Sequence, residues 1–301
     1  MSASMNVLEG PRREIRRVLV GSSAYWAQPV EGGLQLDDGR MVDEVTVRYL
    51  PPCNPSKILC VHTNFRSRVY EFTGKASAPP NPTYFQKPVT ALNAHGGELV
   101  RPEGYKYLNY EGEIAAVIGR PTRNILPDEA WEHIAGFAVS NDVGVHDMRD
   151  TDAGSMLRVK GQDGFCPVGP GLVSGIDIRQ SMIRSYRNGC LVQEGAVAEM
   201  IFGINYLIAD LARHITLMPG DVVLTGTPAN SRPLEPGDLI EIEVTGLGRL
   251  ANRVVAAPAP RAQVGHQPTD TDEVRRVALG NDERLPDAIK AALAAHAQKG
   301  K

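Results

Sequence analysis

The chain has 301 residues, of which 42% are hydrophobic and 22% are charged, and its formal net charge is −3. This length suits one large domain, or one main domain with extensions, and it allows a sizeable buried core. The charge balance is not that of a nucleic-acid binder, so we expect no nucleic-acid partner. No apolar run approaches the roughly 20 residues that a membrane helix needs. We therefore expect no membrane partner and a cytoplasmic location.

The four cysteines are scattered along the chain without a C-x-x-C pair. This pattern predicts free thiols in a reducing cytosol. Cys53 and Cys60 lie near His62, but their spacing matches no common zinc site. The 30 glycines and 22 prolines favour many turns and short strands over a helical bundle. The predicted fold class is therefore α+β, rich in strands and with few helices.

The N-terminal region, residues 1–56, is predicted to be a small β-rich lead-in. Residues 16–28 and 44–50 are strand-like, and the turn sequence "LDDGR" lies between them. After the break at "PPCNPS", residues 57–64 predict a short apolar strand that runs into a polar loop.

Residues 64–82 predict a loop that could include one helical turn and that ends in a proline-rich break. The segment carries three cationic residues and little that would pack, which is typical of a lid or binding loop. Residues 83–93 then resume as a strand.

The stretch "NYEGEIAAVIG", residues 109–119, predicts a strand that is covered on both faces, because apolar residues follow without alternation. Residues two apart in a strand share a face, so Glu111 and Glu113 are expected side by side. Residues 126–136 predict a helix, with Pro127 in its first turn and Gly136 at its C-terminal cap.

Further elements follow from local patterns. Residues 137–143 predict an apolar strand, and residues 146–173 are expected to be loop-rich with a short strand at their end. Asn188-Gly189 predicts a hairpin, and apolar residues at helical spacing predict the longest helix within 196–215. Two "PGD" turns introduce strands near 222–228 and 239–247, which completes the main domain that we expect over residues 57–257.

The C-terminal region, residues 258–301, is expected to be a linker followed by a short alanine-rich helix at 285–298. Three alternatives stay open for this tail: it docks on its own body, it docks on a partner subunit, or it is mobile.

Three acidic residues lie at the heads or ends of apolar strands: Glu111, Glu113 and Asp142. Clustered carboxylates repel one another and are penalised by burial, and a hard divalent cation such as Mg²⁺, Mn²⁺ or Ca²⁺ removes both costs. Taken alone, the glutamate pair is more typical of a solvated strand face or of pairing with Lys and Arg.

Cationic residues surround these positions in the sequence, and an anionic substrate would need several of them. They are Arg66, Arg68, Lys87, His146, Arg149 and Lys160. Lys160 is the most suggestive, because a lysine in a glycine-rich turn before an apolar strand can hold a carboxylate or carry a proton. No dinucleotide, P-loop, nucleophile-elbow or zincin motif is present.

Six stretches occur in an order that resembles the fumarylacetoacetate hydrolase (FAH) superfamily, over roughly residues 57–256. They are "YEGEIAAVIGR", "GFAVSNDV", "KGQDGFCPVGPGLV", "QEGAVAEMIFGINYLI", "LMPGDVVLTGTP" and "LEPGDLIEIEVTGLGRLANRV". Within that family, "NFRSRV" and "DGFCPVGP" are most similar to the isomerase/decarboxylase enzymes of homoprotocatechuate (4-hydroxyphenylacetate) breakdown.

The resemblance implies a mixed β-sandwich roll, assembled as a homodimer, with a Mg²⁺ or Mn²⁺ site. It assigns the metal to Glu111, Glu113 and Asp142, matches the family lysine to Lys160, and places Thr227 near the substrate carboxylate.

Two departures from the family pattern bear on the reaction. Hydrolase-type members carry a His and a Glu three residues apart in the lid, whereas this chain has Arg68 and Glu71 there. Many members have an Arg where this chain has His146. The missing lid His favours decarboxylation or isomerisation over C–C hydrolysis, and the second change suggests a different substrate contact or a replacement base.

The resulting hypothesis is a metal-dependent decarboxylation or double-bond isomerisation of a 2-oxo or 2-hydroxy-enoate acid through an enolate. Lys160, Arg66 and Arg68 would hold a carboxylate, and Glu71 or His146 would move the proton. Closure of residues 64–82 would exclude water. Two alternatives stay open: an acylpyruvate-type C–C hydrolase and a non-catalytic, metal-dependent binder of oxo acids.

Overall fold

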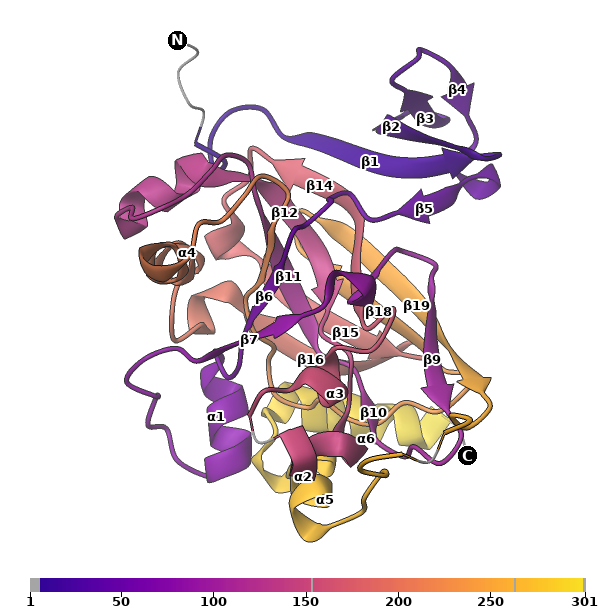
Figure 1. Cartoon of the computed structure of the whole chain (residues 1–301), viewed down its shortest axis with the longest axis vertical. Coiled ribbons are helices and arrows are strands. Elements are labelled where there is room, and N and C mark those ends of the chain that lie inside the picture. Colours follow the sequence, from indigo (N-terminus) through magenta and orange to yellow (C-terminus); the bar gives the residue numbers. More distant parts are fainter. Residues whose placement is uncertain (1–5, 153, 263, 300–301) are drawn as a thin grey trace.

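A twelve-stranded mixed sheet forms the main body of the computed structural model, which describes residues 6–152, 154–262 and 264–299 (Figure 1). The ends of the predicted N- and C-terminal regions, residues 1–5 and 300–301, lie outside the described residues. In sheet order, the strands are β4 (Met41–Val42), β3 (Gly33–Leu36), β2 (Ser23–Val30), β1 (Arg13–Val20), β14 (Cys166–Ser174), β12 (Ile134–Asn141), β11 (Gly112–Ile118), β17 (Val222–Leu224), β6 (Ile58–Val61) and β7 (Tyr84–Lys87). The remaining two are β5 (Arg48–Leu50), which pairs with β1, and β8 (Leu92–Asn93), which pairs with β14.

A five-stranded sheet packs against the central strands of the large sheet, and apolar residues of both sheets share the two main core clusters. Its strands, in order, are β16 (Cys190–Ala196), β15 (Met182–Arg187), β18 (Leu239–Val244), β19 (Gly248–Ala257) and β9 (Glu98–Pro102). A short pair joins β10 (Leu108–Asn109) to β13 (Gly144–Val145). The strand-rich α+β class is confirmed.

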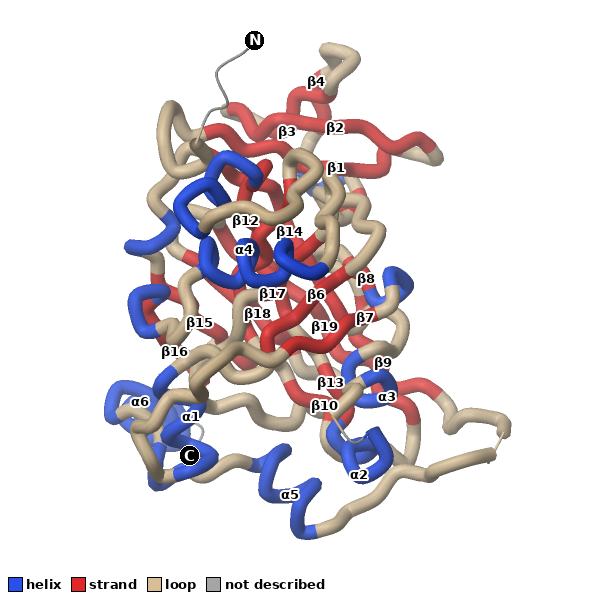
Figure 2. Tube along the Cα trace, turned by 60° about the vertical axis from the view of Figure 1, so that its left-hand side comes forward, coloured by secondary structure: helices blue, strands red, loops and turns tan. Residues whose placement is uncertain are grey.

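Helices are short and lie around the sheets. The α-helices are α1 (Arg66–Thr73), α2 (Arg149–Asp152), α3 (Leu157–Lys160), α4 (Ile204–His214), α5 (Asp272–Leu279) and α6 (Asp287–Lys299). The 3₁₀ helices are η1 (Glu44–Thr46), η2 (Val89–Ala91), η3 (Pro127–His133), η4 (His146–Met148), η5 (Ile178–Gln180), η6 (Val197–Glu199) and η7 (Asp282–Arg284). Helices α1, α2, α5 and α6 gather at the end of the molecule away from β1–β4 (Figures 1 and 2).

The N-terminal strands extend the large sheet, because β1 pairs antiparallel with β14. A turn at residues 21–22 joins β1 to β2, within the stretch predicted to be strand-like. The predicted strand over residues 44–50 is only partly correct. Its first half is η1, because the Asp43 side chain accepts a hydrogen bond from the Val45 N–H and caps a helical turn, and only β5 pairs in the sheet.

Strand β11 is buried along its whole length, as its continuous apolar sequence predicts. It lies between β12 and β17, antiparallel to both. Ala115 and Val117 contribute to one core cluster, and Ile114, Ala116 and Ile118 to the other. The two faces of this strand therefore join the two halves of the core.

The hairpin is confirmed, and the helix predicted over residues 196–215 is confirmed from Ile204 to His214, whereas residues 197–199 form η6 instead. Strands β15 and β16 meet at Asn188 and Gly189, whose φ angles of 50° and 79° suit a tight two-residue turn. Helix α4 buries Ile204, Ile208 and Leu211 on one face, which is the spacing that the sequence predicts.

The predicted α-helix over residues 126–136 is wrong at its C-terminal end. Residues 127–133 form the 3₁₀ helix η3, and β12 begins at Ile134. Gly136 is a strand residue, not a helix cap. A Cβ there would lie 2.8 Å from the Leu172 Cγ and from the Val173 carbonyl oxygen, so the glycine allows β12 and β14 to pack closely.

The lid segment is more ordered than predicted. Residues 66–73 form the eight-residue helix α1, and Arg68, Val69 and Glu71 are buried. The prediction that little in this segment would pack is therefore wrong, because its buried face is largely charged and apolar periodicity does not detect it.

The tail docks on its own body. Helix α6 appears where an alanine-rich helix is predicted, and Leu285 and Ile289 pack on Ala229. The linker is shorter than expected, because α5 forms within residues predicted to have no regular structure. Thr271 caps α5 by accepting a hydrogen bond from the Val274 N–H.

Within the described ranges, none of the helices is long and apolar enough to cross a membrane. The four cysteines are free and buried, as the spacing predicts.

Asp221, in the first "PGD" turn, holds together the starts of two neighbouring strands. Its side chain accepts hydrogen bonds from the backbone N–H groups of Ser56, Lys57 and Met218, and it pairs with the Lys57 ammonium at 2.5 Å. Burial alone would raise the pKa of this fully buried carboxyl, but Lys57 and the N–H donors lower it below its usual value.

We predict that Asp221→Asn lowers the free energy of unfolding by about 2–3 kcal/mol at pH 7, because a buried network loses its charge. The native Asp221 pKa is lowered, so its contribution is present above the unfolded-state pKa and lost as the pH falls through the native one. Denaturant unfolding should therefore separate wild type and variant at pH 7, and the difference should shrink as the pH falls through the native Asp221 pKa. Asp163→Asn, at an exposed position, is the matched control; an equal loss there would contradict this role.

Candidate active site and metal centre

Three buried carboxylates meet where β11 begins and β12 ends. Glu111 precedes β11, Glu113 is its second residue, and Asp142 follows β12 directly. Because the two strands are antiparallel, with Gly112 opposite Asn141, the head of one lies beside the end of the other. One carboxylate oxygen from each residue lies within 4.8 Å of the others. The predicted side-by-side placement of the glutamates is confirmed.

Close packing behind the glutamates fixes the direction of their side chains. Gly112 lies between them, and a Cβ there would be 2.4 Å from the Ser185 Oγ and 3.2 Å from the Ile242 Cγ2. That face of β11 is therefore pressed against the five-stranded sheet. Glu113 is held further by the Gly226 N–H, which donates to its Oε2 at 2.7 Å.

Two buried lysines lie against the carboxylates. The Lys160 Nζ is 2.6 Å from the Glu111 Oε2 and 3.0 Å from the Asp142 Oδ2. The Lys87 Nζ is 2.6 Å from the Asp142 Oδ1. Lys160 reaches this position across Gly144, where a Cβ would lie 2.8 Å from the lysine Cδ.

The surroundings of the cluster shift the pKa values of the two glutamates in opposite directions. Burial would raise the pKa of Glu111, but Lys160 and Arg68 lower it below its usual value. Burial, followed by the charges of Asp142 and Glu111, raises the pKa of Glu113 well above its usual value. Glu113 is thus the carboxyl whose negative charge is offset least by other groups of the protein.

This donor set fits a hard divalent cation. All three ligating groups are carboxylates, and Mg²⁺ and Mn²⁺ prefer oxygen donors. The Asp142 Oδ1, although close to Lys87, makes no well-aligned hydrogen bond. An under-compensated Glu113 and an unsatisfied Asp142 oxygen are what a cation between the three groups would correct.

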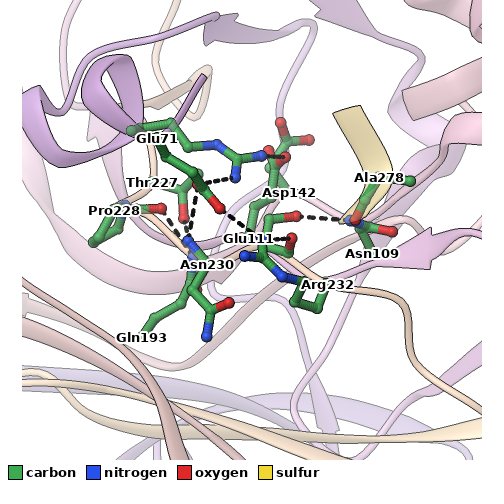
Figure 3. A network of polar contacts seen from close by, with 12 residues as sticks. Glu71, Asn109, Glu111, Asp142, Gln193, Thr227, Pro228, Asn230, Arg232 and Ala278 are labelled. Carbon is green, nitrogen blue, oxygen red and sulfur yellow. Dashed lines mark hydrogen bonds and ion pairs between the residues drawn. The ribbon is translucent and has the colours of Figure 1, made fainter. Parts of the chain in front are cut away.

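A second charged group joins the lid helix to the cluster (Figure 3). Arg68 donates from Nη1 to the Glu71 Oε2 at 2.7 Å and approaches the Glu111 Oε1 with Nη2 at 3.4 Å. Glu71 also pairs with Arg232 at 2.7 Å and accepts the Asn230 N–H at 3.1 Å. Burial would raise the pKa of Glu71, but the two arginines lower it below its usual value.

A cavity of about 290 Å³ opens beside the carboxylates. It is lined by His62, Thr63, Arg68, Phe72, Thr73, Phe85, Glu111, Asp142, His146, Arg149, Met156, Lys160, Thr227, Arg276 and Val277. This volume is at the small end of the roughly 300–1,000 Å³ of typical ligand pockets. The cavity therefore suits a small, anionic molecule.

His146 lies in the wall of this cavity with both ring nitrogens free of hydrogen-bond partners, although it is only 2% exposed. Burial lowers its pKa well below the usual value, and the charges of Lys160 and Arg149 lower it further. The imidazole is thus neutral at pH 7, with one nitrogen able to accept and the other able to donate a proton.

The structure brings most of the predicted site residues together and separates two. Lys160, His146, Arg68 and Thr227 line the cavity with the carboxylates, and the Thr227 Oγ1 accepts a hydrogen bond from the Gln193 side chain at 3.1 Å. Arg66 is exposed and does not line the cavity. Glu71 lies behind Arg68, bonded to arginines, and does not line the cavity either.

Sequence reasoning did not assign several residues that the structure places here. The sequence marks Lys87 and Arg149 only as cations near the carboxylates. In the structure, Lys87 pairs with Asp142 and Arg149 lines the cavity. A polar residue at the end of an apolar strand, as at Lys87, is the signal that could have identified it. Arg232 and Arg276 carry no such signal, because they come from remote parts of the chain.

Several known proteins are similar to this chain. An enzyme of Salmonella dublin, 4-hydroxyphenylacetate degradation bifunctional isomerase/decarboxylase, is 38% identical over 180 residues, which cover 59% of this chain and 42% of that enzyme. This chain thus spans less than half the length of that relative. Oxaloacetate tautomerase YisK of Bacillus subtilis (strain 168) is 32% identical over 219 residues, covering 68% of this chain and 72% of the tautomerase.

A solved structure shares the fold. The 5-carboxymethyl-2-hydroxymuconate delta-isomerase from Mycobacterium smegmatis matches with a TM-score of 0.74 and 32% identity, covering 81% of this chain and 99% of that one. The family described as "Fumarylacetoacetate (FAA) hydrolase C-terminal" matches residues 57–255, which is most of the chain. The resemblance seen in the ordered motifs is therefore confirmed: this chain belongs to the fumarylacetoacetate hydrolase family.

Proposed function

We propose that this protein is a Mg²⁺- or Mn²⁺-dependent enzyme that acts on a small 2-oxo or 2-hydroxy-enoate dicarboxylic acid. It moves a proton to shift a double bond, or it releases CO₂. The isomerase/decarboxylase and tautomerase relatives support this reaction class. A role in the breakdown of aromatic compounds and assembly as a homodimer are parts of the same proposal, and both rest on the family resemblance.

The charge count of the site is the observation that carries the proposal. Lys87, Lys160 and Arg68 match the three buried carboxylates in formal charge, although their ion pairs go to Glu111 and Asp142 and not to Glu113. A divalent cation held by the carboxylates would leave about two uncompensated positive charges at a buried site. A dianionic ligand restores the balance, whereas a neutral ligand does not.

Glu111, Glu113 and Asp142 would hold the metal, which when bound supplies Lewis-acid polarisation of a substrate oxygen. Lys160 has its pKa raised by Asp142 and Glu111 despite burial, so it stays a cation and binds a carboxylate rather than giving up its proton. Thr227 offers a hydroxyl to the same ligand.

His146 is our candidate for the group that moves the proton. It is neutral, lines the cavity and has both nitrogens free. Glu71 is the weaker candidate, because two arginines hold it and lower its pKa. We propose that Glu71 instead positions Arg68 for the substrate. Phe72 and Thr73 of the lid helix line the cavity and would help to exclude water.

The hydrolase alternative predicts a water-activating base in the lid. Arg68 occupies the position where the family resemblance would place a histidine, and an arginine remains protonated and does not activate water. This observation supports isomerisation or decarboxylation over C–C hydrolysis. Product analysis separates the three functions: a moved double bond or CO₂, two cleaved acids, or no turnover for a simple binder.

The next prediction concerns the metal. Glu113→Gln should weaken Mn²⁺ binding by at least about 100-fold, because one of three anionic ligands is lost. Calorimetric titration of metal-free protein measures this. Glu98→Gln, on an exposed position of β9, is the matched control. Unchanged affinity in Glu113→Gln would remove the metal site assignment.

The same variant should have a second effect without metal. The raised Glu113 pKa means that its contribution to stability is present at low pH and is lost as the pH rises above the unfolded-state value. At pH 8, metal-free Glu113→Gln should therefore melt roughly 2–6 °C above metal-free wild type. Added Mn²⁺ should raise the melting temperature of wild type and leave that of the variant unchanged.

A third prediction concerns proton transfer. With oxaloacetate as substrate, His146→Gln should lower kcat on the order of 100-fold, the usual effect of losing a general acid–base. Mn²⁺ affinity should stay within twofold of wild type. The enol–keto change is followed by ultraviolet absorbance, and pyruvate and CO₂ are measured in parallel. His214→Gln, at the exposed end of α4, is the control; an unchanged kcat in His146→Gln would exclude this histidine as the proton carrier.

A further inference from the structure

The C-terminal tail reaches the proposed active site, although the family match ends at residue 255. Helix α5 contributes Arg276 and Val277 to the wall of the cavity that Glu111 and Asp142 also line. It lies beside α2 and the adjoining η4, at the same end of the molecule as the lid helix α1 (Figures 1 and 2). A segment outside the matched region thus forms part of the site.

Buried contacts fix the position of α5. The Asn109 Nδ2 donates to the Ala278 carbonyl oxygen at 2.8 Å, a contact drawn in Figure 3. Val274 and Ala278 pack on Tyr107. At Gly280, directly after the helix, a Cβ would lie 2.2 Å from the Glu71 Oε1. The tail backbone therefore passes directly against the carboxylate that holds the lid arginine.

The residues that follow α5 also hold the lid helix. The Arg284 Nη1 donates to the Glu71 carbonyl oxygen at 3.3 Å, and Asp282 pairs with Arg232 at 2.8 Å. Because Arg232 pairs in turn with Glu71, the tail and the lid share one network of charges. The cavity wall that α5 provides is thus tied to the rest of the site.

Two arginines from different elements line this part of the cavity. Arg149 begins α2 and is 33% exposed at its side chain, and Arg276 lies on α5. A single carboxylate, that of Glu273, lies near both: it is 2.8 Å from Arg276 and 3.9 Å from Arg149. Burial lowers the pKa of Arg149, and Glu273 offsets this only in part. Glu111 also acts on Arg149 from across the cavity, but Glu273 is the carboxylate that pairs with both arginines, and it balances only one of their two charges.

We propose that Arg149 and Arg276 bind the second carboxylate of the substrate, so that the tail makes the site selective for diacids. The inference rests on the proposed function, which requires a substrate whose first carboxylate is held near the metal ligands. Glu273 occupies the arginine pair in the free protein. An incoming carboxylate replaces it and makes charge-assisted hydrogen bonds to guanidinium groups that are already brought together.

The competing interpretation is a surface ion pair without a ligand. Exposed pairs of this kind contribute little to stability, and Arg276 and Glu273 are about half exposed. The two interpretations differ in what they predict for matched ligands, because only a substrate-binding pair distinguishes a diacid from a monoacid.

The test compares malate with 2-hydroxybutyrate on the full chain loaded with Mn²⁺. Both molecules have four carbons and the same 2-hydroxy acid group, and they differ only in a terminal carboxylate in place of a methyl group. Isothermal titration measures both affinities in wild type, Arg276→Gln, Arg149→Met and Glu273→Gln. Arg275→Gln is the matched control, because it removes a charge from the same helix at a position that does not line the cavity.

We expect wild type to bind malate more tightly than 2-hydroxybutyrate. Arg276→Gln and Arg149→Met should each weaken the binding of malate about 5- to 20-fold, in line with the loss of one charge-assisted hydrogen bond. The affinity for 2-hydroxybutyrate should change less than twofold. Glu273→Gln should strengthen the binding of malate about threefold. Misfolding of the variant would not produce a gain in affinity. Arg275→Gln should leave both affinities within twofold of wild type.

Three results would contradict the inference. Equal losses of affinity for malate and for 2-hydroxybutyrate would mean that the arginines have only a structural role. Unchanged malate affinity in both arginine variants would leave them as a solvated surface pair. If wild type with bound Mn²⁺ takes up neither ligand, the proposed function fails, and the selectivity inference fails with it.

Discussion

The structure depends on how three buried carboxylates are kept together. Like charges at this separation repel strongly in a medium of low dielectric, and burial penalises each one. Lys160 and Lys87 offset most of that cost at Glu111 and Asp142. Glu113 receives only a backbone N–H from Gly226, so its pKa stays high. The protein thus keeps one carboxyl under-compensated, which a bound cation would relieve.

The sheets hold the carboxylates in place by packing. The antiparallel pairing of β11 with β12 places the head of one strand at the end of the other, so residues about 30 positions apart share one site. Gly112 and Gly144 leave the space that this arrangement needs, one for the five-stranded sheet and one for the Lys160 side chain. The site therefore depends on glycines beside its charged residues, because a larger side chain at either position would clash.

The lid and the tail extend the charged network outward. Arg68 connects Glu111 to Glu71, and Glu71 connects to Arg232 and the tail. Loops usually carry such contacts because a rigid scaffold positions them. Here a segment beyond the matched family region closes one wall of the cavity, and it adds a cation, Arg276, that the family match does not contain.

Local pattern was enough to predict the β-rich fold, the Asn188-Gly189 hairpin and the helix at α4, whereas the carboxylate trio was assigned as a site only through the ordered motifs. The fold class, the hairpin and the helix depend on periodicity and turn chemistry over a few residues, which the chain carries directly. Patterns of this range failed where long-range packing decided the outcome. The helix predicted to reach Gly136 ends early because β12 requires that glycine, and α1 buries charged residues that no apolar period marks.

The amino-acid sequence by itself placed Glu111, Glu113 and Asp142 at the ends of continuous apolar stretches, and the ordered motifs around them pointed to these residues as metal ligands. Only the tertiary structure decided which cations meet them. Lys87, Arg232 and Arg276 come from distant segments, and their distances to the site depend on how sheets, lid and tail pack. Contacts between remote residues arise from the burial of the whole chain, and no local pattern encodes them.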